Sequence, residues 1–124
     1  MPRVQELLAA QGVTFNNSFV TSPICLPSNV TSLTGQYTFT HGVLNNLYPT
    51  GGFQKFADLG GDQSTLATWL DDAGYNTARV GKYLVEYPLD STYIPPGWDE
   101  WYSTGSSEVR YFNYALNDNG QLAV

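Results

Sequence analysis

The chain has 124 residues, of which 42% are hydrophobic, so its size and composition suit one globular unit. Its 5 Lys and Arg against 11 Asp and Glu give a formal net charge of −6, which argues against nucleic-acid binding, because that binding depends on clustered basic side chains. A polyanionic partner would need a local basic pocket, for which Arg79, Lys82 and Arg110 are the candidates. The first residues lack a long apolar run behind a basic segment, so neither a signal peptide nor a membrane span is expected.

The first part of the chain predicts a helix followed by an extended segment. Val4, Leu7 and Leu8 recur at helical spacing, and Gly12 is suited to end the helix. Residues 13–20 place apolar side chains mostly on one face, which favours an extended segment.

Cys25 is the only cysteine of the chain, so it cannot close a disulfide within it. A helix is predicted to begin near Cys25, because Pro27 fits the first turn of a helix and Gly35 fits the left-handed residue just past its end. At a helix N-terminus the unpaired backbone N–H groups favour an anion, such as a thiolate or a bound ligand. The cysteine taken alone is better explained as a buried, inert thiol.

The middle of the chain predicts a loop, a helix and a strand. Residues 36–62 carry five of the twelve glycines and little periodicity, which indicates a loop with short turns. A helix is then expected, capped by Ser64 and ended by Gly74, with a strand over residues 75–80. A helix joined to a strand by a short link is the unit of a layered α/β sheet. The apolar face of this helix is predicted at Leu66, Trp69, Leu70 and Ala73.

The last part predicts a turn-rich crossing over residues 88–97 and a strand over residues 111–116. The run NDNG at residues 117–120 is a strong hairpin signal and predicts a return strand after it. The predicted elements favour a layered α/β fold.

Two short blocks carry a family resemblance. Cys25 opens the run CLPSN over residues 25–29, and Thr34 and Gly35 follow after four further residues. This resembles the signature of the sulfatases, Cys-x-Pro-Ser-Arg-x4-Thr-Gly, in which the cysteine is oxidised after synthesis to formylglycine. The chain matches every defined position except Asn29, where the family has arginine.

The second block, GYNTARVGKYL over residues 74–84, resembles the second sulfatase pattern, in which the lysine, here Lys82, touches the substrate sulfate. A second signature in the right order lowers the risk of a chance match. The segments before and between the two blocks also look like the corresponding sulfatase segments, so the resemblance covers nearly the whole chain. Lys82 taken alone would be a solvated surface lysine.

The last third narrows the resemblance. PPGWDEW at residues 95–101 and YFNYAL at residues 111–116, together with Glu86 and Tyr87, resemble the glucosamine-6-sulfatases and the heparan endosulfatases. The resemblance therefore implies sulfated amino sugars of glycosaminoglycans as substrates. Trp98, Trp101 and Tyr102 could stack on a sugar ring, but aromatic residues at this density favour core packing.

The resemblance implies an α/β, alkaline-phosphatase-like sulfatase fold, with a mixed sheet flanked by helices, of which residues 1–124 are a partial N-terminal catalytic domain. The family's first strand, with its calcium-binding aspartates, and the C-terminal part are interpreted as lying outside the chain. Calcium is the expected metal, and Cys25, as formylglycine, is the one ligand assigned here. Such proteins are commonly secreted, periplasmic or lysosomal, and the location of this one is left open.

The resemblance also implies a mechanism. Cys25, converted by the formylglycine-generating enzyme, would be the nucleophile, and Lys82 would bind the sulfate and stabilise the charge that develops on it. Asn29 would contact the substrate site, but it is uncharged and shorter than the family arginine. His41 is expected to be structural. The alternative to a sulfuric ester hydrolase is a non-catalytic sulfatase-like domain or a truncated inactive remnant. A phosphatase or phosphodiesterase is weaker, because those relatives use Ser or Thr as nucleophile.

Overall fold

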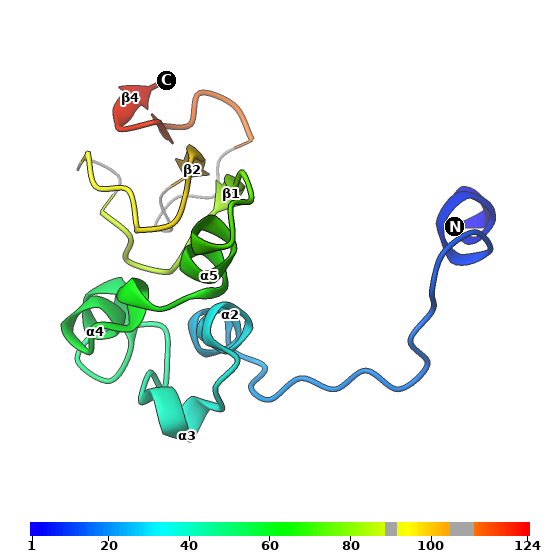
Figure 1. Ribbon diagram of the computed structural model, residues 1–124, viewed down its shortest axis with the longest axis horizontal. Helices are drawn as coiled ribbons and strands as arrows, with labels where there is room; N and C mark the ends of the chain where they lie inside the picture. Colours follow the sequence, from blue (N-terminus) through cyan, green and yellow to red (C-terminus); the bar gives the residue numbers. More distant parts are fainter. Residues whose placement is uncertain (89–91, 105–110) are drawn as a thin grey trace.

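The computed structural model describes residues 1–88, 92–104 and 111–124, so Arg110 lies outside the described residues. Figure 1 shows a folded body of helices and strands, from which the first residues of the chain extend as a separate arm. The arm begins with α1 (Pro2–Val4) and the π-helix η1 (Gln5–Ala9), which confirms the first predicted helix.

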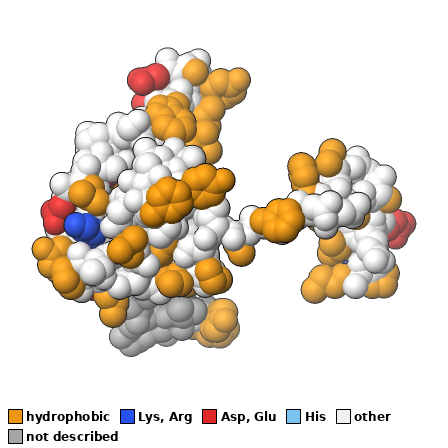
Figure 2. All heavy atoms as spheres, turned by 90° about the horizontal axis from the view of Figure 1, so that it is seen from below, with side chains coloured by type: hydrophobic (Ala, Val, Ile, Leu, Met, Phe, Trp, Pro, Cys, Tyr) orange, Lys and Arg blue, Asp and Glu red, His pale blue; other side chains and the backbone are white. Residues whose placement is uncertain are grey.

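The arm exposes its apolar side chains. Phe15 and Phe19 are 79% and 88% exposed, and Figure 2 shows hydrophobic side chains spread over the part that stands apart from the body. The extended segment predicted over residues 13–20 is not a strand. A strand is stabilised by the ladder of a neighbouring strand, and the described residues provide no such neighbour for this segment.

The helix α2 (Cys25–Thr34) begins and ends as predicted. Ile24 is extended and its carbonyl accepts the Ser28 N–H at 3.0 Å, which starts the helical ladder. Gly35 has φ 68° and its N–H donates to the Thr31 carbonyl at 2.8 Å, so the glycine ends the helix in the left-handed region. The buried face of α2 consists of Leu26, Pro27 and Val30.

The prediction of a loop over residues 36–62 is wrong. This segment forms α3 (Thr38–His41), α4 (Gly52–Asp58) and the start of the 3-10 turn η2 (Gly61–Gln63). Phe53 and Phe56 lie three positions apart and bury one face of α4. The glycines lie at helix boundaries. Gly42, with φ 71°, ends α3, and Gly52, with φ 81°, is the first residue of α4.

The helix α5 (Leu66–Asp72) is confirmed, but its cap and its buried face differ from the prediction. Thr65, not Ser64, is the N-cap, and its side chain and that of Thr68 form a reciprocal capping box. The buried residue is Ala67, whereas Leu66 and Trp69 are 48% and 46% exposed. The reason is a close contact with the backbone at Gly97, where an added Cβ would lie 2.4 Å from the Thr68 nitrogen.

Four strands form one mixed sheet in the order β1-β2-β3-β4, which confirms the α/β class. The strands are β1 (Ala78–Lys82), β2 (Glu100–Thr104), β3 (Leu116–Asp118) and β4 (Gln121–Ala123). β1 pairs with β2 in parallel, and the other two pairings are antiparallel.

Two strands are displaced from their predicted positions. β1 starts three residues later than residue 75, because Thr77 is fixed by Asp99, whose carboxylate accepts the Thr77 N–H at 2.7 Å. β3 covers residues 116–118 instead of 111–116, since the side chain of Asn117 is buried as part of the strand. The hairpin is confirmed, with Asn119 and Gly120 at φ 49° and 85° in its turn. The crossing over residues 88–97 has neither helix nor strand in its described part.

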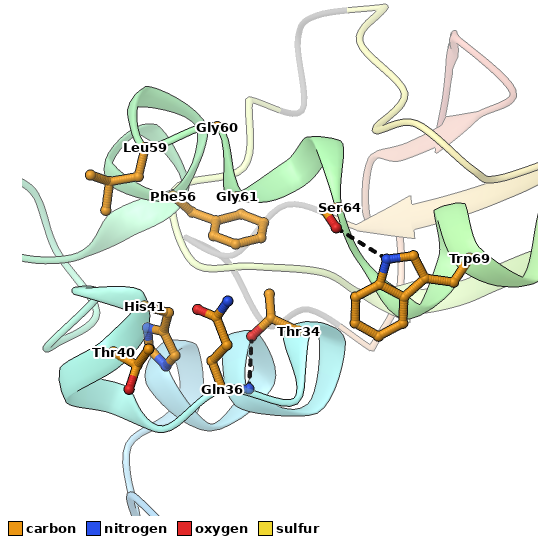
Figure 3. A pocket seen from close by; sticks show the side chains of 10 residues that line it. All are labelled: Thr34, Gln36, Thr40, His41, Phe56, Leu59, Gly60, Gly61, Ser64 and Trp69. Carbon is orange, nitrogen blue, oxygen red and sulfur yellow. Dashed lines mark hydrogen bonds between the residues drawn. The ribbon is translucent and has the colours of Figure 1, made fainter.

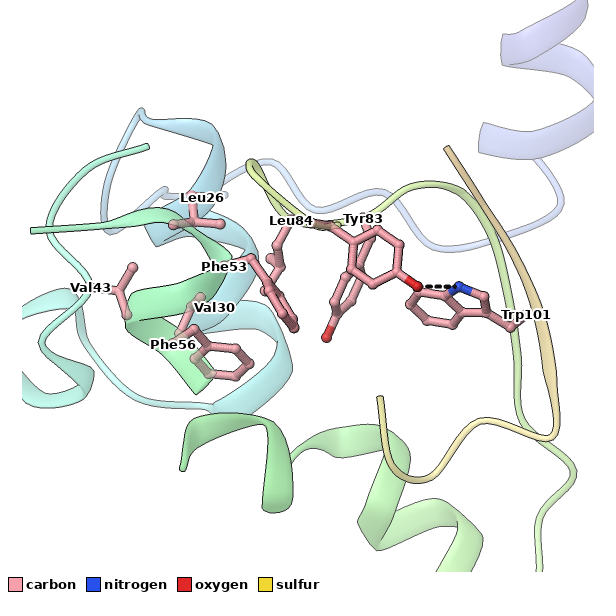
Figure 4. Close-up of a cluster of buried hydrophobic side chains, with 9 residues drawn as sticks. Leu26, Val30, Val43, Phe53, Phe56, Tyr83, Leu84 and Trp101 are labelled. Atoms are coloured by element: carbon pink, nitrogen blue, oxygen red, sulfur yellow. Dashed lines mark hydrogen bonds between the residues drawn. The ribbon is translucent and has the colours of Figure 1, made fainter. Parts of the chain in front are cut away.

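The core is one aromatic and aliphatic cluster between α2, α4 and the start of the sheet (Figure 4). Trp101 is fully buried and packs edge-on against Tyr83, with ring centroids 4.9 Å apart, so core packing is confirmed for this tryptophan. The hydroxyl of Tyr87 accepts hydrogen bonds from Trp101 Nε1 at 3.1 Å and from Asn117 Nδ2 at 3.0 Å, which satisfies these buried polar atoms. Within the described ranges, the helices are all too short or too polar to cross a membrane.

Candidate active site

Cys25 is the first residue of α2 and carries an exposed free thiol. Its neighbours in the signature, Leu26 and Pro27, are buried and hold the helix end against the core. The thiol is therefore presented to solvent from a fixed backbone position. The buried-thiol interpretation of Cys25 is wrong.

Asn46 closes the first turn of α2 from outside the helix, a role that the sequence did not reveal. Its Oδ1 accepts the Leu26 N–H at 2.9 Å. Pro27 has no N–H, so the helix end beside Cys25 keeps fewer donors for an anion than a regular helix would. The sequence carries only a weak signal for this hydrogen bond, because Asn46 and Leu26 are twenty positions apart.

Asn29 follows Cys25 by one helical turn, and residues at this spacing share a helix face. It is half-buried and lines a pocket of about 200 Å³ between α2, α5 and β1. Arg79 from β1 lines the same pocket. The structure therefore brings Asn29 together with Arg79, one of the three basic residues that the sequence analysis named as candidates for a local basic pocket. The full lining is Asn29, Ser32, Leu33, Leu66, Arg79, Tyr83, Leu84 and Trp98.

Lys82 is the last residue of β1 and its side chain is exposed. Its backbone carbonyl accepts a hydrogen bond from Arg79 Nη2. The next residue, Tyr83, is 2% exposed and lies in the same buried cluster as Leu26, the residue that follows Cys25. Across the described ranges, however, no side-chain hydrogen bond joins Cys25, Asn29 and Lys82.

His41 is a structural residue. Its Nδ1 accepts the Val43 N–H at 3.1 Å, which leaves Nε2 to carry the proton toward Thr31 Oγ1 at 3.3 Å. Burial lowers the pKa of His41 below its usual value, because desolvation disfavours the charged imidazolium. The imidazole thus joins α3 to α2 in its neutral form, as the prediction of a structural role requires.

A second pocket, of about 320 Å³, lies at the other end of α2 (Figure 3). Thr34 and Gln36 line it from the end of α2, His41 from α3 and Trp69 from α5. Cys25, Asn29 and Lys82 are not among its lining residues. A helix of ten residues is about 15 Å long, so this pocket is remote from the helix end that carries Cys25.

The described residues do not by themselves form a calcium site. In the parts of the chain that the structure describes, no group of three or more His, Cys, Asp and Glu side chains could hold a metal ion. Calcium requires six to eight oxygen ligands that converge on one point.

Comparison with known proteins gives matches over nearly the whole chain. The Sulfatase family profile matches residues 1–120. The chain is 39% identical over 121 residues to an extracellular sulfatase SULF-1 homologue of Drosophila melanogaster, covering 98% of this chain and 10% of that protein. It is 32% identical over 126 residues to the human N-acetylglucosamine-6-sulfatase, covering 98% of this chain and 23% of that protein.

An arylsulfatase of Chlamydomonas reinhardtii is 41% identical over 91 residues, which cover 73% of this chain and 14% of that protein. The chain thus spans less than a quarter of the length of each of these relatives. No solved structure matches it.

Proposed function

This chain belongs to the sulfatase family, a family of hydrolases, and we propose that it is part of a sulfuric ester hydrolase whose nucleophile derives from Cys25. The observation that carries the proposal is the exposed thiol of Cys25 at the first residue of α2, next to buried signature residues that fix its backbone. A converting enzyme needs access to this side chain, and so does a substrate.

The proposed chemistry begins with a two-electron oxidation of Cys25 to formylglycine, for which the formylglycine-generating enzyme uses an external oxidant such as molecular oxygen. A carbonyl oxygen replaces the thiol, and the sulfur leaves as hydrogen sulfide. One hydroxyl of the hydrated aldehyde attacks the sulfur of the ester, and the alcohol leaves as its S–O bond breaks. The second hydroxyl then loses its proton and re-forms the aldehyde, which expels sulfate. Lys82 offers a positive charge to the sulfate oxygens, and Asn29 offers a neutral hydrogen bond in the position of the family arginine.

Sulfated amino sugars of glycosaminoglycans are the proposed substrate class. The name of the human relative, N-acetylglucosamine-6-sulfatase, supports it, and the name arylsulfatase for the algal relative shows that other sulfate esters deserve testing. We place residues 1–124 in the N-terminal catalytic part of an alkaline-phosphatase-like fold. The mixed sheet, whose strand β1 meets α2 and α5 around one pocket, supports this assignment.

The test has two readouts, conversion and hydrolysis. The protein is co-expressed with the converting enzyme, and peptide mass spectrometry measures the fraction of Cys25 present as formylglycine. Hydrolysis of 4-methylumbelliferyl sulfate is measured on the polypeptide that carries this chain at its natural length. Cys25→Ala should abolish both signals, whereas Lys82→Ala should leave conversion intact and reduce turnover about 10²-fold or more.

Asn29→Arg decides how much the departure from the signature matters. If the family arginine serves both conversion and catalysis, this variant should raise the formylglycine fraction and the hydrolysis rate above those of the parent. Equal values in parent and variant would show that Asn29 is a tolerated substitution. Cys25 found as a thiol in both proteins would contradict the proposed nucleophile.

The second candidate function is a non-catalytic sulfatase-like domain. The observation that favours it is Asn29, because a neutral side chain replaces the charge that the signature carries there. This alternative predicts binding of sulfated carbohydrate without turnover, even after complete conversion of Cys25 in the Asn29→Arg variant.

A further inference from the structure

The pocket that Asn29 and Arg79 share combines one cation with apolar walls. Its volume is about 200 Å³, and Arg79 is the charged residue among its lining residues. Leu33, Leu66 and Leu84 supply aliphatic surface, and Trp98 adds a half-buried ring. Among the described residues, no carboxylate lines the pocket, so none of these lining side chains repels an anion.

Arg79 is held in place but has no counter-ion among the residues that the structure describes. Its Nη2 donates to the Lys82 carbonyl, and its Cζ lies 5.6 Å from the centroid of the Tyr83 ring, which fixes the guanidinium over that ring. Its Nε is buried without a hydrogen-bond partner. Within the described ranges, no acidic side chain forms an ion pair with it.

A half-buried guanidinium without an anion carries an uncompensated desolvation cost. A bound oxyanion removes that cost, because it accepts charge-assisted hydrogen bonds from the planar donors. The aliphatic and aromatic walls at the same time favour an apolar body over a small, fully hydrated ion. The pocket therefore suits a molecule that joins an oxyanion to an apolar group.

We infer that this pocket binds an organic sulfate, with Arg79 as the cation that receives the sulfate group. Arg79 on β1 thereby supplies a guanidinium to the pocket in which Asn29 on α2 stands in place of the signature arginine. Asn29 is one turn, about 6 Å of helix rise, from Cys25, but neither Cys25 nor Lys82 lines this pocket, so the sulfate group at Arg79 is distinct from the one proposed to contact Lys82. Naming sulfate as the oxyanion rests on the proposed function, whereas the positive pocket rests on the geometry alone.

The test is a binding titration of the unconverted 124-residue chain by calorimetry. The probes are phenyl sulfate, inorganic sulfate and phenol, which separate the oxyanion from the apolar body. Phenyl sulfate should bind more tightly than either of the others. Arg79→Leu should weaken phenyl sulfate binding about tenfold or more, since a hydrogen bond to a charged group is lost. Lys55→Gln, which removes the same charge from α4 outside the pocket, should leave the affinity unchanged.

A charge exchange sharpens the test. Asn29→Arg added to Arg79→Leu should restore most of the lost affinity, because it returns a guanidinium to the same pocket from the opposite wall. Arg79→Lys should bind more weakly than the parent and more tightly than Arg79→Leu, because it keeps the charge without the planar fork. If the near-ultraviolet dichroism of Arg79→Leu differs from that of the parent, this variant has lost its tertiary packing and its affinity is not used. The phenyl sulfate affinity of Arg79→Lys is then compared with that of Lys55→Gln, and only Arg79→Lys should bind more weakly than the parent.

The inference is overturned if the parent does not bind phenyl sulfate, or if phenol binds as well. It is also overturned if Arg79→Leu binds like the parent, or if Lys55→Gln loses as much affinity as the Arg79 variants. Binding requires no formylglycine. A failure of conversion with intact binding therefore counts against the proposed function, and a failure of binding with intact conversion counts against this pocket.

Discussion

The exposed ends of α2 and β1 differ from the buried residues that immediately follow them. Cys25 and Lys82 are exposed, whereas Leu26 is fully buried and Tyr83 is 2% exposed, and both buried residues lie in one cluster. Each signature therefore has an exposed residue proposed for the chemistry, which is its chemical position, followed directly by a buried residue that packs in the core, which is its anchoring position. The difference teaches that changes at the chemical positions should affect reactivity without affecting stability, and that changes at the anchors should do the reverse.

The largest effect is expected at the centre of the anchoring cluster. Trp101→Ala should lower the free energy of unfolding by about 3–5 kcal/mol, because it leaves a cavity and removes the donor that Tyr87 uses. Urea unfolding followed by far-ultraviolet dichroism measures the change. Trp69→Ala is the matched control, since this ring is 46% exposed, and it should cost far less. Equal losses in the two variants would refute the distinction between core and surface tryptophans.

A neighbouring pair tests the comparison directly within α2. Leu26→Ala should cost about 2–5 kcal/mol of unfolding free energy, because its fully buried side chain packs in the main cluster. Cys25→Ala, one residue earlier, should change that free energy by less than about 0.5 kcal/mol, since the thiol is exposed. The same urea titration serves for both variants. A loss at Cys25 comparable to that at Leu26 would show that the thiol is part of the core.

A smaller effect is expected where the helix end is capped. Asn46→Ala should lower stability by about 1 kcal/mol, because the Leu26 N–H loses its acceptor at the start of α2. Thermal unfolding detects a change of this size. Asn16→Ala, in the exposed arm, provides the control and should leave the midpoint unchanged. If the two variants unfold alike, Asn46 does not stabilise the end of α2 that presents Cys25.

The smallest effect concerns pH. Burial lowers the folded-state pKa of His41 below the usual 6.5, so the unfolded chain binds a proton at a higher pH than the folded one. The contribution of His41 to stability should be fully present above about pH 6.5 and should decline as the pH falls toward the folded-state pKa. Urea titrations at several pH values, with His41→Gln as the variant, isolate this dependence from that of the carboxylates. A steeper decline in the variant would reverse the assignment of the neutral imidazole.

The sequence by itself determined the features that depend on neighbouring residues. The bounds of α2 follow from Pro27 in its first turn and Gly35 just past its end, and the hairpin follows from Asn119 and Gly120. The signatures at residues 25–35 and 74–84 likewise identified the family, since a motif is a local pattern. These signals act within a few residues along the chain, where no knowledge of distant contacts is needed.

The tertiary structure alone decided the features that join distant segments. The helix α4 is stabilised by burial of Phe53 and Phe56, which outweighs the surrounding glycines, and the buried face of α5 is set by Gly97 approaching Ala67 and Thr68. Residues 13–20 have the composition of a strand but lack a partner.

The candidate site also contains residues that the sequence predicted and residues that only the tertiary structure revealed. The sequence indicated Cys25, Asn29 and Lys82 through their motifs, but it did not reveal the Asn46 cap or the pocket that Arg79 shares with Asn29. Asn29 and Arg79 are fifty positions apart, and which face of β1 meets which face of α2 depends on the packing of the whole core. Helix propensity and capping are local, whereas the burial that orients a side chain belongs to the complete set of contacts.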